Sequence, residues 1–182
     1  MKKLTLLSAI CAICAQTIYS QVIPDLYLGL TPPGVTPEIF APEIVSLSGR
    51  NERVITFSPT GHEIFFAIGD WPTRKTMYIQ YLDSAWTSPV LAPFSVTRSA
   101  EEPFFSLDGN RIYYYAYPPS SSSNADICYS EKIGSLWSDP ISIGSSFNTT
   151  TDEFHPNLVN DGSIYFANRS EEHTSELQSP NT

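Results

Sequence analysis

Three acidic residues recur along the chain and are its best candidates for binding chemistry: Glu52, Glu102 and Glu153. Each precedes a glycine-containing turn, by nine residues for Glu52 and Glu153 and by seven for Glu102. Repeated carboxylates around a channel could hold a cation or a basic group of a ligand. Alternatively, they accept backbone hydrogen bonds in loops or face water. We take the three glutamates as candidate ligand-binding residues.

Catalytic patterns are missing from the sequence. His62 and Glu63 begin a zinc-protease pattern, but Phe66 stands where the second histidine is required. There is no G-x-S-x-G nucleophile elbow, phosphate loop or EF-hand loop. We expect His62 in a hairpin turn and His155 in a loop before a strand, both with structural roles. The sequence therefore predicts no catalytic residue, no metal site and no cofactor.

Composition favours an all-β protein without nucleic-acid partners. The net charge is -9, whereas a nucleic-acid binder needs a basic face that meets phosphate. Apolar residues make up 41% and aromatic residues 13% of the chain, which also has 15 prolines. Tyrosine and phenylalanine suit pleated sheets, and proline marks edges and turns.

The N-terminus has the pattern of an export signal. Lys2 and Lys3 precede an apolar run over residues 4–15, and small residues follow, so we predict a signal peptide over residues 1–20. The apolar run is too short to span a bilayer. We therefore expect a periplasmic or secreted protein that does not span the membrane.

Three segments share one pattern: residues 57–66, 105–114 and 158–166. Each predicts a strand, a tight turn with glycine and a second strand, because glycine adopts a positive φ without steric cost. An isoleucine followed by aromatic residues comes after each turn. A strand that is apolar at consecutive positions is covered on both faces.

A tryptophan also recurs at a similar distance after two of these turns. Trp86 and Trp137 lie 51 residues apart, and a further strand is predicted before each, over residues 76–81 and 126–130. Four strands in about fifty residues is the period of a propeller blade. The predicted fold over residues 37–168 is therefore all-β: a partial β-propeller with about two complete four-stranded blades plus part of a third.

The segment before the first repeat is expected to close the ring. Residues 37–47 resemble the outer strand that ends the first blade, so we predict that they supply the outer strand of the last one, with residues 21–36 as a linker. An incomplete propeller should leave apolar blade faces uncovered, which predicts aggregation.

The repeated motif F-S-x-[DT]-G-x-x-I-[FY]-[FY], followed by a Trp-x-x-Pro strand, resembles the TolB-type propeller repeat, a relative in shape of WD-repeat propellers. The resemblance covers residues 40–168. Cys128 replaces a tyrosine that the family usually has in the third strand, and Thr60 replaces the turn aspartate. The resemblance implies an exported or periplasmic propeller that binds proteins or small ligands, while the chemistry does not transfer between members.

The C-terminal residues differ from the repeats. Residues 169–179 resemble translated sequencing-adapter DNA, so we predict that residues 169–182 are a non-native tail and that the natural protein continues beyond Asn168.

These observations favour a non-catalytic, exported propeller module that binds a protein or glycan. Two alternatives remain open at this point. The repeats could be the propeller domain of a larger peptidase-type hydrolase, or part of an envelope protein with a peptidoglycan-binding domain.

Overall fold

The computed structural model describes residues 26–32 and 34–169, which form three antiparallel sheets and two short 3₁₀ turns, with no α-helix in these ranges. The predicted signal peptide and residues 170–182 of the predicted tail lie outside the described residues. No helix in the described ranges has the length and apolar character needed to cross a membrane. The all-β prediction is confirmed for the described chain.

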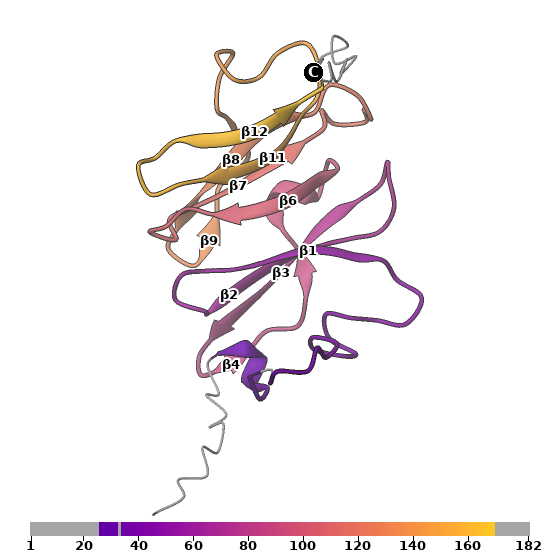
Figure 1. The fold of residues 1–182 in the computed structure, drawn as a ribbon, viewed down its shortest axis with the longest axis vertical. Helices are drawn as coiled ribbons and strands as arrows, with labels where there is room; N and C mark the ends of the chain where they lie inside the picture. The colour runs from indigo at the N-terminus through magenta and orange to yellow at the C-terminus, as the bar shows by residue number, and fades with distance from the viewer. Residues whose placement is uncertain (1–25, 33, 170–182) are drawn as a thin grey trace, which may run out of the picture.

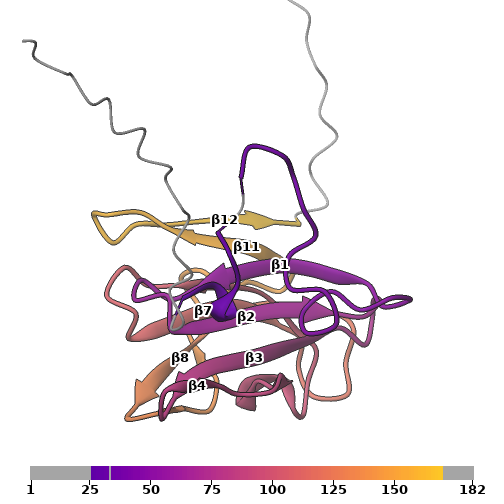
Figure 2. The same ribbon diagram turned by 90° about the horizontal axis from the view of Figure 1, so that it is seen from below.

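The first sheet contains β1 (Glu52–Phe57), β2 (Glu63–Ile68), β3 (Lys75–Leu82), β4 (Ala85–Trp86) and β5 (Val90–Leu91). The order is β1-β2-β3-β4, and β5 also pairs with β3 (Figure 2). The fourth strand of the predicted unit is thus split into two short pieces that share β3 as their partner.

The second sheet repeats this arrangement. It contains β6 (Ala100–Phe105), β7 (Arg111–Ala116), β8 (Asp126–Ile133), β9 (Leu136–Trp137) and β10 (Ile141–Ser142), with both short strands paired to β8. The third sheet consists of two strands, β11 (Glu153–Leu158) and β12 (Ile164–Asn168). The sheets follow one another along the long axis of the molecule (Figure 1).

The three predicted hairpin turns are confirmed. Gly61, Gly109 and Gly162 have φ values of 76°, 70° and 86°, and each donates its N–H to the carbonyl three residues earlier. Glycine is favoured here because a Cβ is strained at such angles. The turns place the repeated isoleucines at matching positions, where Ile64, Ile112 and Ile164 pair with Phe57, Phe105 and Leu158.

Phe65 is the centre of the core between the first and second sheets. Its ring lies 4.5 Å from that of Tyr78, 5.7 Å from Phe94, 5.5 Å from Phe105 and 5.7 Å from Trp137, measured between centroids. Because Phe105 and Trp137 belong to the second sheet, the two sheets pack face to face. The repeated tryptophan of one sheet therefore packs on the sheet before it.

The opposite face of the first sheet is covered by the N-terminal segment, residues 26–32 and 34–46. Ala41 and Val45 are buried against Ile64 and Phe66, and Leu28 packs on the same cluster. Figure 2 shows this segment, in indigo, lying across the sheet. It begins with η1 (Tyr27–Gly29), so part of the predicted linker contacts the sheet.

Residues 37–47 do not form the predicted strand. Their β-pairing is limited to an isolated bridge between Pro42 and Ser46, and Val45 donates its N–H to Ala41 in a tight turn. The turn directs two apolar side chains of this segment onto the first sheet, and that burial is the physical reason for the difference. The expectation that apolar sheet faces stay uncovered is therefore wrong for this face of the first sheet.

The third sheet packs on the second through Phe154, which lies 4.9 Å from Tyr115 in an edge-to-face arrangement. Tyr117 and Ala125 belong to the same cluster. On β12, Tyr165 is 65% exposed, so an aromatic side chain of the last sheet stays in solvent.

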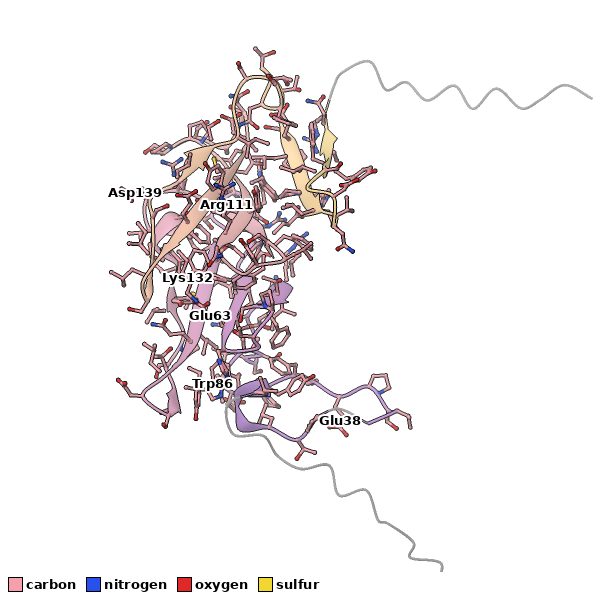
Figure 3. All side chains as sticks on the ribbon, turned by 90° about the vertical axis from the view of Figure 1, so that its left-hand side faces the viewer. Glu38, Glu63, Trp86, Arg111, Lys132 and Asp139 are labelled. Atoms are coloured by element: carbon pink, nitrogen blue, oxygen red, sulfur yellow. The ribbon has the colours of Figure 1, made fainter. Side chains whose placement is uncertain are left out.

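A buried carboxylate connects the first two sheets. Glu63 on β2 is ion-paired with Lys132, and it accepts hydrogen bonds from Tyr78 Oη at 2.7 Å and from Trp137 Nε1 at 3.3 Å. Figure 3 shows Glu63 and Lys132 where the two sheets meet. Burial and the neighbouring Glu63 raise the pKa of Tyr78 well above its ordinary value, so its hydroxyl remains a hydrogen-bond donor.

Candidate functional site

The first strand of every sheet has the same irregularity at its third residue. The register shifts after Arg53, Glu101 and Phe154, and the following residues adopt positive φ: 27° at Val54, 55° at Glu102 and 55° at His155. A bulge of this kind turns a side chain away from the regular alternation of the strand. The strands β1, β6 and β11 lie beside one another, so the three bulges recur from sheet to sheet (Figure 1).

Two of the bulge residues contact each other. His155 donates its backbone N–H to Glu102 Oε2 at 2.9 Å, and its Nδ1 lies 2.6 Å from the same oxygen. The Glu102 side chain is 12% exposed and the imidazole 69%. Burial raises the pKa of Glu102, against the opposing effect of the His155 charge. His155 therefore lies inside β11, not in the loop that we predicted, and contacts a candidate residue.

A second, deeper ion pair lies behind this contact. Arg74 Nη1 is 3.0 Å from Glu101 Oε2, and Glu101 is almost fully buried. Glu101 Oε1 and Arg74 Nε are shielded from solvent and have no hydrogen-bond partner among the described residues. This buried pair therefore lies beneath the surface of the site and fixes the position of Arg74.

Arg74, Glu102 and His155 border a cavity of about 460 Å³. Trp71, in the loop between β2 and β3, is 55% exposed at this cavity. Tyr115 has its pKa raised far above the ordinary value by burial and by the charges of Glu101 and Glu102, so it stays protonated. The cavity is lined by Arg53, Trp71, Arg74, Glu102, Tyr115, Tyr117, Ser122, Asp152, Phe154, His155 and Arg169. Aromatic surface with a few fixed polar groups is the usual make-up of a ligand site.

Of the three glutamates singled out in the sequence, Glu102 lies at this cavity. Glu52 and Glu153 do not line it; each instead holds the loop before its own strand. Glu52 Oε1 lies 2.5 Å from Arg50 Nε and accepts the N–H of Leu47 at 3.3 Å. Glu153 Oε1 accepts the Thr149 hydroxyl at 2.5 Å.

The difference follows from position in the strand. Glu52 and Glu153 are the first residues of β1 and β11, whereas Glu102 is the third residue of β6. Ala100 takes the first place in β6. The unequal spacing of nine, seven and nine residues was the signal that the three are not equivalent.

The sequence did not nominate Trp71, Arg74 or Tyr115. Tyr115 belongs to an aromatic run that predicts only a covered strand, and Trp71 and Arg74 lie in a loop that no motif marks. A proline follows the bulge residues Glu102 and His155, and this repeated pair could have located the bulges.

The geometry can be compared with two kinds of chemistry: a serine nucleophile activated by histidine, and a bound metal ion. Ser122 lines the cavity, but no hydrogen bond joins its hydroxyl to His155 within the described part of the chain. Over those same residues, no group of three or more His, Cys, Asp and Glu side chains is arranged to hold a metal ion. The described contacts suit binding through stacking and hydrogen bonds.

Comparison with family models, with curated proteins and with solved structures gave no match for this chain.

Proposed function

We propose that the chain is part of an exported, propeller-type module that binds a glycan in the cavity beside Glu102. Support for the propeller comes from the strand-by-strand repetition of the first two sheets. Further support comes from their face-to-face packing and from the neighbouring first strands of all three sheets. Export rests on the composition of residues 1–20.

The observation that carries the binding proposal is the combination of Trp71 with Arg74 and Glu102 at one cavity. The indole offers a flat apolar surface at the cavity, on which the apolar face of a sugar ring can stack. At the cavity, the guanidinium of Arg74 offers donors and the carboxylate of Glu102 offers acceptors. A sugar hydroxyl both donates and accepts, so it matches these two groups.

The volume of the cavity agrees with a short glycan. A value of about 460 Å³ falls within the range of roughly 300–1,000 Å³ that is common for small-ligand sites. Arg169 also lines the cavity, but it is the first residue of the predicted tail, so the proposal does not depend on it.

Binding should be tested with immobilised glycans and with the full chain. We expect at least one class of glycan to bind, and Trp71→Ala to weaken that binding by about fivefold or more, since one stacked ring contributes about 1 kcal/mol or more. Tyr165→Ala is the matched control, because Tyr165 is an exposed aromatic residue on β12 that does not line the cavity.

Two outcomes would contradict the proposal. One is equal loss of affinity in the Trp71 and Tyr165 variants, which would place binding outside the cavity. The other is an absence of glycan binding together with binding of arrayed peptides that depends on Trp71.

A further inference from the structure

A lysine holds the loop between the first and second sheets. Lys75, the first residue of β3, donates from Nζ to the carbonyl oxygens of Ser95 at 2.9 Å and Arg98 at 2.8 Å, with Val96 O at 3.4 Å. These carbonyls belong to the loop that follows β5 and includes η2 (Pro93–Ser95). A positive charge is therefore surrounded by loop oxygens at this place.

Asp126 takes the same place in the second sheet. It is the first residue of β8, as Lys75 is of β3. The neighbouring contacts agree, because Thr76 N donates to Ser95 Oγ at 2.8 Å and Ile127 N donates to Asn148 Oδ1 at 2.9 Å. The loop before β11 therefore wraps β8 as the loop before β6 wraps β3, with a carboxylate in place of the ammonium.

A second carboxylate lies beside Asp126. Glu153 is fully buried, and its N–H donates to Ala125 O at 2.8 Å. Glu153 Oε2 and Asp126 Oδ1 are both shielded from solvent and have no hydrogen-bond partner among the described residues. Burial, followed by the charge of Glu153, raises the pKa of Asp126, so the two carboxylates are within electrostatic reach of each other. Glu153 Oε1 accepts hydrogen bonds from Thr149 and Asn168, so one oxygen of each carboxylate is left shielded and without a partner, which is unfavourable.

The loop before β11 offers oxygens of the kind that calcium prefers. The loop carbonyls that correspond to those around Lys75 belong to Asn148, Thr149 and Thr151, and none of them accepts a backbone hydrogen bond in the described loops. Ca²⁺ takes six to eight oxygen ligands from carboxylates, backbone carbonyls and water in flexible geometry, whereas Mg²⁺ demands a strict octahedron. Two carboxylates would balance its charge.

We propose that Asp126 and Glu153, together with carbonyls of the loop before β11, bind a Ca²⁺ ion in the position that the Lys75 ammonium takes in the preceding repeat. The ion joins β8 of the second sheet to the start of the third sheet. The site uses neither Trp71 nor Glu102, so it does not depend on the proposed glycan binding. We expect a dissociation constant of about 10⁻⁴–10⁻³ M, as in extracellular calcium modules.

The test is titration of the chelator-treated full chain with CaCl₂, followed by calorimetry and by thermal unfolding. At one hundred times Kd, we expect Ca²⁺ to raise Tm by about 5–10 °C. Asp126→Asn should weaken Ca²⁺ binding about tenfold or more. Asp139→Asn, which removes an exposed carboxylate elsewhere on the second sheet, should leave binding unchanged.

A third variant tests whether Asp126 and Lys75 occupy equivalent positions in the two sheets. Asp126→Lys restores the residue type of the preceding repeat, so this variant should be at least as stable without Ca²⁺ as the parent chain and should gain nothing from CaCl₂. The proposal is overturned by the absence of binding heat and of a Tm shift in the parent chain, or by an equal shift with MgCl₂. It is also overturned if calcium is ineffective while acidification alone stabilises the parent chain, since the carboxylates would then share a proton.

Discussion

Single residues decide how the repeated sheets are joined, and Glu63 is the clearest case. It is 4% exposed and contacts Lys132 and Trp137 of the next sheet. The corresponding residue one repeat later, Arg111, forms its ion pair with Glu131 on its own sheet, with both side chains nearly half exposed. The first residue of the second strand therefore lies at the interface between sheets in the first sheet and at the surface in the second.

This contrast gives a prediction at the residue scale. Glu63→Ala should lower the free energy of unfolding by roughly 2–4 kcal/mol, because it leaves Lys132 and the Trp137 N–H without their buried partner. Glu131→Ala removes a carboxylate from an exposed pair and should cost less than about 1 kcal/mol. Urea unfolding of both variants measures the difference, and equal losses would contradict a special role for the buried carboxylate.

At the scale of elements, hydrophobic pattern and turn chemistry place the strands well. The predicted third strands over 76–81 and 126–130 lie within β3 and β8, because alternating and aromatic residues there face two packed layers. The bulges in β1, β6 and β11 were not predicted, because a one-residue shift in strand pairing hardly changes the pattern of apolar and polar residues. Yet the bulges bring Glu102 to His155, and so they create the candidate site.

The bulge in β1 can be tested by changing its backbone preference. Val54 has φ of 27° and an exposed, β-branched side chain, a combination that costs roughly 1 kcal/mol. Val54→Gly relieves this strain and should leave the free energy of unfolding unchanged within about 0.5 kcal/mol or raise it.

Ile55→Gly is the control for that experiment. Ile55 is also exposed and lies next in β1, but it is not among the residues with positive φ. Its replacement should lower the free energy of unfolding by about 1 kcal/mol, because glycine weakens an ordinary strand position. If the two variants unfold at the same denaturant concentration, Val54 is not strained in solution.

At the scale of the whole molecule, the array of sheets has two different ends. The first sheet is covered by residues 26–32 and 34–46, whose buried Ala41 and Val45 lie on the face opposite the second sheet. The last sheet keeps Tyr165 in solvent. Coverage by the N-terminal segment thus buries apolar side chains of the first sheet, while the last sheet keeps an aromatic side chain exposed.

Val45 allows this coverage to be tested. Val45→Asp places a charge against Ile64 and Phe66, so we expect a loss of about 3 kcal/mol or more in the free energy of unfolding and increased binding of a hydrophobic dye. The neighbouring Ile44 is 39% exposed, and Ile44→Asp should cost less than about 1 kcal/mol. Similar dye binding by the two variants would mean that the segment does not cover the sheet.

By itself, the sequence determined the all-β class, the three glycine turns and the equivalent strand positions of Ile64, Ile112 and Ile164. Each of these features depends on local backbone preference or on a short hydrophobic period. Tertiary structure alone decided that Glu102 meets His155, that Glu153 bonds to Ala125 just before the start of β8, and that Val45 covers the first sheet. These contacts join residues distant in the sequence, and their energies come from burial and charge that exist only after the sheets have packed.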